Sequence, residues 1–332
     1  MFKFFKLLFL MTLILGSIIS ISSVSWFYSW LGLEVNLLSF IILMKTPSNK
    51  YSSESISKYF MTQAMASFIL LFSIMVFMNS LEFNFELNYF SSIMASSAIL
   101  MKMGAAPLHF WFPEVASSIS WNMNFLLLTW QKVAPMILLT YLMMIPNMMI
   151  LFIITSGIVG SIMGLNQVCL RKILAYSSIN HIGWMLASVM CSTNLWMIYI
   201  LVYSMMNLVI INMLKYWKIF FISQMNKIKN NLNKILVMMN FLSLGGLPPF
   251  PGFIPKWMVI SSLSKSLFFF LTFFMIIFTL ITLFFYLRIT FSSMTLYTNN
   301  SMMMMNNSYK LFPSMLALLT FTPVVFLSMM LM

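Results

Sequence analysis

The chain has 332 residues, of which 61% are hydrophobic and only 7% are charged. Soluble domains carry about 25% charged residues, so this composition excludes a soluble globular protein. The formal net charge of +13 would suggest nucleic-acid binding in a soluble chain, but the basic residues here are spread between apolar runs. The class that remains is an all-α polytopic membrane protein, and no nucleic-acid partner is expected.

Runs of about 20 apolar residues predict about eleven transmembrane helices in a single integral membrane domain, residues 1–332. The predicted spans are 3–23, 26–44, 58–79, 88–107, 122–145, 148–168, 172–192, 195–217, 235–258, 267–290 and 311–331. Residues 223–234 and 298–309 are predicted to be loops. The first run follows Lys3 and Lys6 and could instead be a signal peptide, but it lacks an Ala-type cleavage site, so we interpret it as a span.

The basic residues indicate how these spans are oriented. With eleven spans, most of them fall on the side of the N-terminus: Lys3, Lys6, Lys45, Lys50, Lys58, Arg171, Lys172, Lys215, Lys218, Lys227, Lys229, Lys234, Arg288 and Lys310. The opposite side receives Lys265, together with Glu82 and Glu86. The positive-inside rule therefore places the N-terminus on the cytoplasm-like side, which in a mitochondrion is the matrix.

The two cysteines give no indication of a cofactor. Cys169 and Cys191 lie in or beside apolar runs and form no CxxC spacing. We therefore expect two small buried side chains, with no metal or iron–sulfur site and no cofactor in this chain.

Four charged residues fall within or at the end of apolar runs: Glu34, Lys102, Lys132 and Lys256. A charge at the centre of a bilayer costs about 2.5–3.5 kcal/mol on insertion scales, so four unpaired charges would cost on the order of 10 kcal/mol. Such residues are expected to face the bundle interior, to pair with one another and to mark a proton or ion path. A structural salt bridge is the alternative for Glu34, and a side chain extended to the membrane surface is the alternative for Lys102 and Lys256.

These four residues suggest a proton path. Burial favours the neutral form of a lysine, whereas a nearby carboxylate favours the charged form. Glu34 and Lys102 are the natural candidates for such a pair, with Lys132 as the central relay and Lys256 next to one side of the membrane. His109 and His181 titrate near neutrality and are further candidates for passing protons. A capping role for His109 and a hydrogen-bonded packing role for His181 remain open.

Two predicted spans are interrupted by Gly and Pro. The strings GAAPLHFWFPE (104–114) and GGLPPFPGFIPK (245–256) both contain small residues, a proline, aromatic residues and a second proline before a charge. Proline removes a helix hydrogen bond and frees backbone groups to meet water or ions. The strings belong to the fourth and ninth spans, which run in opposite directions. This pattern predicts an inverted repeat, with a first half at about 1–145, a second at about 146–290 and a C-terminal helix at about 311–331. Two coincidental kinks are the alternative.

Several strings resemble the mitochondrial NADH–ubiquinone oxidoreductase chain 2 family. They are WLGLEVNLLSF (30–40), KYFMTQAMAS (58–67), LMKMGAAPLHFWFPEV (100–115), TWQKVAP (129–135), LNQVCLRKILAYSSINHIGWML (165–186) and NFLSLGGLPPFPGFIPKW (240–257). The resemblance runs from about residue 26 to about residue 290. Pro251 departs from the family pattern, which more often has an aliphatic residue or Thr there, and leaves the local geometry of the second break open.

The resemblance implies an antiporter-like, proton-pumping subunit of respiratory complex I in the mitochondrial inner membrane. It implies that Glu34 and Lys102 form the coupling pair, that Lys132 is the central lysine and that Lys256 leads to the exit. The implied partners are the other membrane-arm subunits and membrane lipid, with cardiolipin as a candidate at the Lys-rich stretch 215–234. NADH, FMN, iron–sulfur clusters and ubiquinone are expected on other subunits. The alternatives are a stand-alone cation/proton antiporter of the same fold and a structural scaffold with vestigial charges.

Overall fold

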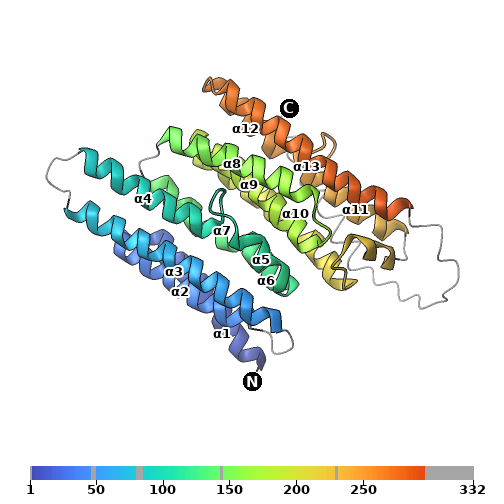
Figure 1. Ribbon diagram of the computed structural model, residues 1–332, viewed down its shortest axis with the longest axis horizontal. Coiled ribbons are helices and arrows are strands. Elements are labelled where there is room, and N and C mark those ends of the chain that lie inside the picture. Colours follow the sequence, from blue (N-terminus) through green and yellow to red (C-terminus); the bar gives the residue numbers. More distant parts are fainter. Residues whose placement is uncertain (1, 46–49, 80–84, 143–144, 229–230, 296–332) are drawn as a thin grey trace. The chain divides into compact units, whose positions relative to one another are not determined.

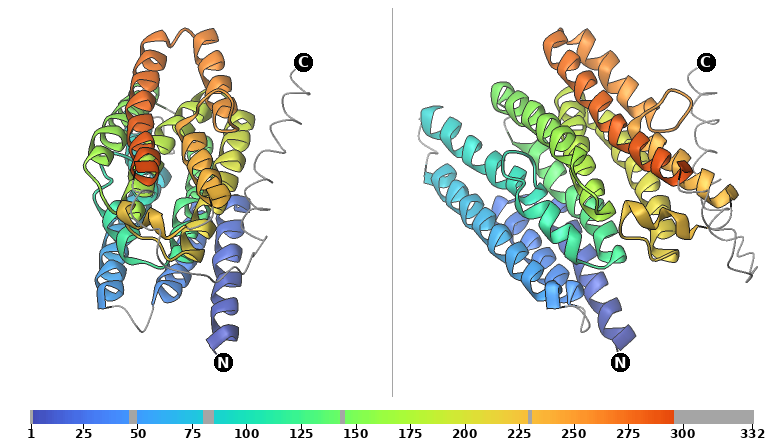
Figure 2. Two further views of the ribbon diagram at one scale, coloured as in Figure 1. Left: turned by 90° about the vertical axis from the view of Figure 1, so that its right-hand side faces the viewer. Right: turned by 45° about the vertical axis from the view of Figure 1, so that its right-hand side comes forward.

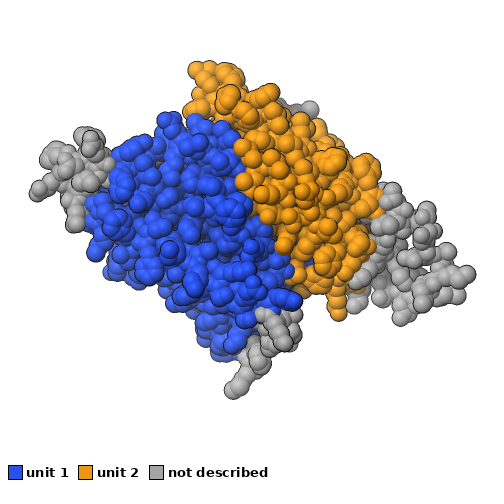
Figure 3. Space-filling view, in the orientation of Figure 1, with its two compact units in different colours: residues 1–156 blue, residues 157–332 orange. Residues whose placement is uncertain are grey.

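The computed structural model describes residues 2–45, 50–79, 85–142, 145–228 and 231–295, which form helices joined by short connections (Figures 1 and 2). The chain divides into two compact units: unit 1 comprises residues 1–156 and unit 2 comprises residues 157–332 (Figure 3). Within the described part, six helices are long and apolar enough to cross a membrane: α1, α2, α3, α8, α10 and α13.

Unit 1 is built from paired helices. Its elements are α1 (Phe2–Ser22), α2 (Trp26–Met44), α3 (Lys50–Asn79), α4 (Phe85–Met103), α5 (Trp111–Ser118), α6 (Trp121–Leu128), α7 (Trp130–Tyr141) and the first half of α8 (Pro146–Leu165). Helix α1 packs along α2 and α3 packs along α4, while α2 also contacts α3 (Figure 1). The short helix α5 lies against α3, and α7 contacts both α1 and α4. This packing surrounds the end of α4, where Lys102 lies.

Two glycines allow α1 and α2 to approach closely. A Cβ atom at Gly32 would lie 2.6 Å from the backbone nitrogen of Ser20, and one at Gly16 would lie 2.9 Å from that of Asn36. Small residues at such crossings are typical of helix pairs in membranes, where association depends on close van der Waals packing. The first apolar run is therefore an integrated helix of the fold, as expected for a span.

Unit 2 is arranged around α9. It contains the second half of α8, α9 (Leu170–Cys191), α10 (Thr193–Tyr216), the 3₁₀ helix η1 (Ile222–Lys227), α11 (Asn231–Gly245), α12 (Phe253–Lys265) and α13 (Phe269–Thr295). Helix α9 is buried over most of its length and contacts α10, α12 and α13. Arg288 of α13 donates hydrogen bonds to the carbonyl oxygens of Leu165 and Gln167, which tie the C-terminal end of α8 to α13.

The all-helical membrane fold predicted from the sequence is confirmed, with differences in detail. The sequence predicted a loop up to the start of the third span at residue 58. Helix α3 begins earlier, at Lys50, so Lys58 lies inside a helix. Part of the predicted loop 223–234 is helical, since it contains η1 and the first turn of α11. The helix α5 was not predicted. The eleventh span (311–331) and the loop 298–309 lie outside the described residues.

The predicted fifth and ninth spans are each divided in two. The fifth consists of α6 and α7, which meet at Thr129, where the backbone dihedral angles are −116° and −70°. The ninth consists of α11 and α12, and Pro251 lies in the turn between them, two residues before α12 begins at Phe253. The turn therefore accommodates Pro251 outside both helices, while Pro255 lies in the first turn of α12. The inverted repeat stays a prediction.

Candidate proton-transfer sites

The first candidate site lies where α4 ends. Gly104 has a φ of +76°, and its N–H bonds to the carbonyl oxygen of Met101, so the helix stops directly after Lys102 and Met103. A Cβ atom at Gly104 would lie 3.0 Å from the ring of Phe112. Glycine suits this position because it adopts the left-handed conformation without strain and leaves room for the aromatic ring.

The end of α4 brings Lys102 close to Glu34. Lys102 Nζ lies 3.9 Å from Glu34 Oε1, and the two side chains are 4% and 25% exposed. That carboxylate oxygen is buried and has no hydrogen-bond partner among the described residues. The ammonium group of Lys102 is therefore the cation that compensates the charge of Glu34 inside unit 1. The pairing expected from the sequence is present in the structure.

Two side chains stabilise the last turn of α4. Gln63 donates from Nε2 to the carbonyl oxygen of Lys102 at 3.1 Å, and Trp111 donates from Nε1 to that of Met101 at 3.3 Å. The last carbonyls of a helix have no partner within the helix, and in a membrane they need one from elsewhere. Gln63 therefore positions the backbone of Lys102. The sequence analysis did not single it out, although an amide inside an apolar run was a usable signal.

Lys132 lies in the first turn of α7, directly after the interruption at Thr129. Its side chain is 1% exposed, and Nζ lies 5.6 Å from the centre of the Phe112 ring, a cation–π distance. The same aromatic ring thus touches the break at Gly104 and the central lysine. The neighbouring Gln131 donates a hydrogen bond of 2.9 Å to Asn36, which links α7 to α2.

An ion-pair cluster at the surface contacts the helix after the first break. Lys58 Nζ lies 2.8 Å from a carboxylate oxygen of Glu54 and 2.7 Å from one of Glu114. These side chains are about half exposed, so solvent screens both ion pairs and their contribution to stability is small. The pair of Lys58 with Glu114 joins α3 to α5. Glu114 therefore faces outward. It ends the string 104–114 as Lys256 ends the string 245–256, but the two side chains differ in burial.

The second break places Lys256 in the interior of unit 2. Its side chain is 5% exposed, and Nζ donates hydrogen bonds of 3.0 and 2.9 Å to the carbonyl oxygens of Leu244 and Gly245 at the end of α11. Gly246, with a φ of +82°, follows this helix end. The C-terminal end of a helix carries partial negative charge, so it stabilises an ammonium group without a carboxylate. The side chain of Lys256 is therefore buried within unit 2, because the first turn of α12 points it back onto α11.

The two histidines differ in their surroundings. His109 is 5% exposed, and its Nδ1 lies 3.2 Å from the carbonyl oxygen of Pro107 in its own loop, which agrees with the capping alternative. His181 in α9 is 3% exposed, and its Nδ1 lies 2.8 Å from the hydroxyl of Tyr199 in α10. The ring of Tyr203 lies 4.9 Å from that of His181. The sequence analysis missed both tyrosines, because Tyr in an apolar helix resembles an ordinary aromatic packing residue.

The described residues contain no group of three or more His, Cys, Asp or Glu side chains that could bind a metal ion. Cys169 and Cys191 are both free thiols. The side chains at the sites are carboxylate, ammonium, imidazole and phenol groups, all of which can donate or accept protons.

Comparisons with known proteins show the family to which the chain belongs. The family model described as NADH:quinone oxidoreductase/Mrp antiporter, TM, matches residues 22–282. NADH-ubiquinone oxidoreductase chain 2 of Anopheles gambiae is 48% identical over 90% of this chain and 89% of the relative. The protein of the same name from Locusta migratoria is 44% identical over 89% of this chain and 87% of the relative. The chain belongs to the NADH-ubiquinone oxidoreductase chain 2 family.

Solved structures show the fold of this chain-2 family member. A chain of respiratory complex I from Thermus thermophilus is 19% identical and has a TM-score of 0.85, over 96% of this chain and 77% of that one. A chain of the Mrp complex from Dietzia sp. is 16% identical and has a TM-score of 0.75, over 85% of this chain and 59% of that one. The antiporter-like fold expected from the sequence is therefore confirmed.

Proposed function

We propose that this chain is a core membrane-arm subunit of proton-translocating NADH:ubiquinone oxidoreductase, in which it carries protons and no redox centre. The observation that carries the proposal is the ion pair of Lys102 with Glu34 at a helix break inside unit 1. A charged pair at such a place is costly for a membrane protein and is typical of ion and proton paths.

The pair can convert a change in charge into the movement of a proton. While Glu34 is ionised, its carboxylate favours the ammonium form of Lys102. When Glu34 takes up a proton or moves away, the buried ammonium loses its counter-charge, and the neutral form of Lys102 is favoured. Lys102 then gives its proton to the next group. Lys132, buried against Phe112 in the same unit, is the proposed central relay.

In unit 2 the proposed carriers are His181 and Lys256. The hydrogen bond between His181 and Tyr199 gives the imidazole a partner that can both donate and accept a proton. Lys256 lies at the second helix break, next to the proposed exit. His109 in unit 1 is a further candidate for proton transfer.

The location and partners follow from the same assignment. We propose the mitochondrial inner membrane, with the N-terminus in the matrix and the C-terminus in the intermembrane space, and the other membrane-arm subunits as partners. NADH, FMN, iron–sulfur clusters and ubiquinone are assigned to other subunits. Lys215 and Lys218 are exposed in the Lys-rich stretch, which supports contact with anionic lipid such as cardiolipin there.

The test is Lys132→Met in the assembled complex, with Lys265→Met, at an exposed lysine in the last turn of α12, as the matched control. We expect Lys132→Met to slow NADH-driven proton translocation by about tenfold or more, because a relay group is lost, while the control keeps the original rate. A native gel stained for NADH oxidation shows that both assemblies are intact. An unchanged rate in an intact Lys132→Met assembly would assign the chain a scaffold role.

A stand-alone cation/proton antiporter is the second candidate, and the family model and the Mrp similarity support it. The native gel separates the two functions. A complex subunit migrates with a very large NADH-oxidising assembly. An antiporter migrates alone or as a small oligomer and exchanges cations for protons in liposomes.

A further inference from the structure

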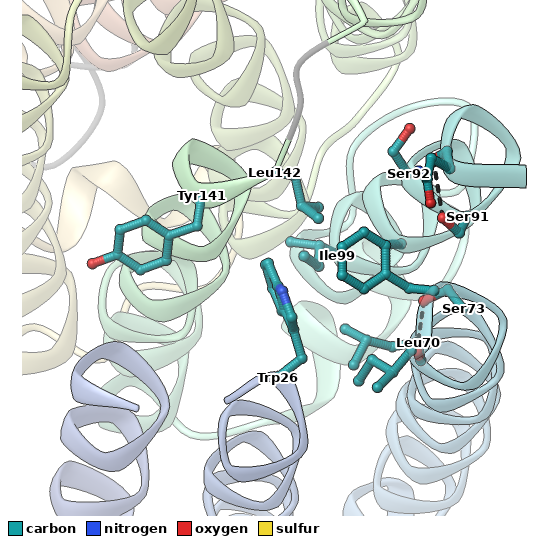
Figure 4. A pocket seen from close by; sticks show the side chains of 12 residues that line it. Trp26, Leu70, Ser73, Ser91, Ser92, Ile99, Tyr141 and Leu142 are labelled. Atoms are coloured by element: carbon teal, nitrogen blue, oxygen red, sulfur yellow. Dashed lines mark hydrogen bonds between the residues drawn. The ribbon is translucent and has the colours of Figure 1, made fainter. Parts of the chain in front are cut away.

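A pocket with a volume of about 360 Å³ lies in unit 1 (Figure 4). Its wall is formed by the start of α2, the second half of α3, residues 88–99 of α4 and the end of α7. Most of the lining is apolar: Leu70, Ile74 and Phe77 from α3, Ala95 and Ile99 from α4, and Leu142 after α7. The volume falls at the lower end of the range of about 300–1,000 Å³ that is typical of small-molecule sites.

The serines in the lining do not make the pocket polar. Ser73 donates to the carbonyl oxygen of Leu70, Ser91 to that of Asn88 and Ser92 to that of Tyr89, at 2.6–3.0 Å. The first two of these bonds are drawn in Figure 4. Each hydroxyl proton is therefore used within its own helix, and the pocket presents mainly carbon to an occupant.

A more polar hollow of about 290 Å³ adjoins this pocket. Ser23, Ser25 and Ser29 line it, and it shares Trp26 and Tyr141 with the apolar pocket. Trp and Tyr are enriched where a membrane meets water, because their rings are apolar and their N–H or O–H groups are polar. Trp26 also begins α2, whose first-turn N–H groups have no acceptor within the helix.

The lining also limits the charge of an occupant. None of the described residues that line either hollow is Lys, Arg, Asp or Glu. A headgroup with a net negative charge would find no cation among them. Helices α2 and α3 both have the length and apolar composition of membrane spans, so the molecules that reach this surface are lipids.

We propose that these adjoining hollows bind one zwitterionic phospholipid. One acyl chain occupies the apolar pocket, and the glycerol and headgroup lie at the serine-lined hollow beside Trp26 and Tyr141. The site is separate from the proton-transfer residues and does not depend on their roles.

The experiment uses the assembled complex in nanodiscs that contain phosphatidylcholine with a photoreactive diazirine on one acyl chain. After illumination and proteolysis, mass spectrometry locates the lipid adducts. We expect adducts on the lining residues of α3 and α4 to saturate at a low fraction of probe, whereas adducts on exposed apolar residues elsewhere rise in proportion to the probe.

The variant Ala95→Phe fills the pocket from α4, where Ala95 is buried. We expect the added ring to take the space of the acyl chain and to reduce adducts on the lining by about tenfold, which corresponds to a loss of about 1.4 kcal/mol in binding free energy. The control Leu201→Phe, on a residue of α10 that is 61% exposed, leaves them unchanged. If Ala95→Phe does not assemble, Ser92→Phe at a half-buried position serves the same purpose.

Three results would overturn the proposal. Adducts on the lining that rise in proportion to the probe show ordinary contact with surrounding lipid. An absence of lining adducts, while the exposed face of α10 is labelled, shows that another protein covers the pocket. Equal labelling by phosphatidylglycerol with the same photoreactive chain shows that the site does not select a zwitterionic headgroup.

Discussion

The two lysines at the helix breaks are stabilised by different groups. Lys102 faces the carboxylate of Glu34, whereas Lys256 donates to two backbone carbonyls at the end of α11. A helix end interacts with a cation by about 0.3–2 kcal/mol, depending on burial. The position of the Lys256 ammonium therefore depends on the shape of the backbone at Gly245 and Gly246.

We predict that Gly246→Ala displaces Lys256 and lowers proton translocation. A Cβ atom there would lie 2.9 Å from Nζ and Cδ of Lys256, and the left-handed backbone costs a non-glycine residue about 1–2 kcal/mol. The lysine side chain is flexible, so it moves off the carbonyls while the helices stay in place. The measurement is the rate of proton translocation by the intact complex.

The adjacent glycine is the matched control for that prediction. A Cβ atom at Gly245 would meet its nearest atom, in Tyr286, at 3.5 Å, an ordinary contact. We expect Gly245→Ala to keep the original rate. Adding Lys256→Met to Gly246→Ala should cause little further loss, because both changes remove the same interaction. Fully additive losses would show that Gly246 acts apart from Lys256.

At this scale the sequence predicted the charged residues better than their partners. A charge in an apolar run is visible in the sequence, and the resemblance to the chain 2 family implied that Glu34 pairs with Lys102. The contacts of Lys132 with Phe112 and of His181 with Tyr199 depend on which face of each helix turns inward. In a chain that is apolar on almost every face, hydrophobic periodicity does not reveal that orientation.

Among the helices, the interruptions with Gly and Pro were predictable and the one without them was not. The breaks after Met103 and Gly245 contain residues that terminate helices, and both Gly104 and Gly246 have positive φ. The interruption at Thr129 lies in the string LLTWQK, which contains neither residue. Thr129 donates its hydroxyl to the carbonyl oxygen of Phe125, and such a bond competes with the regular helix pattern. The result is a separate first turn in which Lys132 lies.

We predict that the contact between α1 and α2 depends on Gly32. Replacement by Leu places side-chain atoms where the backbone of Ser20 and Gly16 lies, so the helices must separate. Gly32→Leu should lower the amount of assembled complex several-fold, measured on a native gel. Val35→Leu, on the exposed face of the same helix, adds bulk without a neighbouring backbone and should assemble normally. Equal assembly of the two variants would show that the glycine contact is not needed.

For the whole molecule, the charge bias predicts which ends of the helices face the matrix. We expect a cysteine at Lys215 to face the matrix and one at Ser266, after α12, to face the intermembrane space. Both positions are exposed. In a background with Cys169 and Cys191 replaced by Ser, a membrane-impermeant maleimide should label Ser266→Cys in intact mitoplasts. It should label Lys215→Cys only after the inner membrane is opened, and the reverse pattern would invert the topology.

The class of fold followed from composition and from the apolar runs, because a run of about 20 apolar residues crosses a membrane as a helix. The division into two compact units was harder to predict from the sequence. The boundary at residue 156 lies inside the continuous helix α8, where no Gly–Pro string or polar linker marks it. Contacts between helices define the units, and a local stretch of sequence does not predict those contacts.

The different partners of Lys102 and Lys256 have a consequence for the direction in which protons move. A carboxylate can be ionised or protonated, so it attracts a neighbouring cation strongly in one state and weakly in the other. Backbone carbonyls have a permanent dipole, so their attraction for a cation does not change. A device that moves protons one way needs at least one stage that changes with the cycle and one that stays constant. The break beside Glu34 is suited to the stage that changes, and the break beside Gly246 is suited to the stage that stays constant.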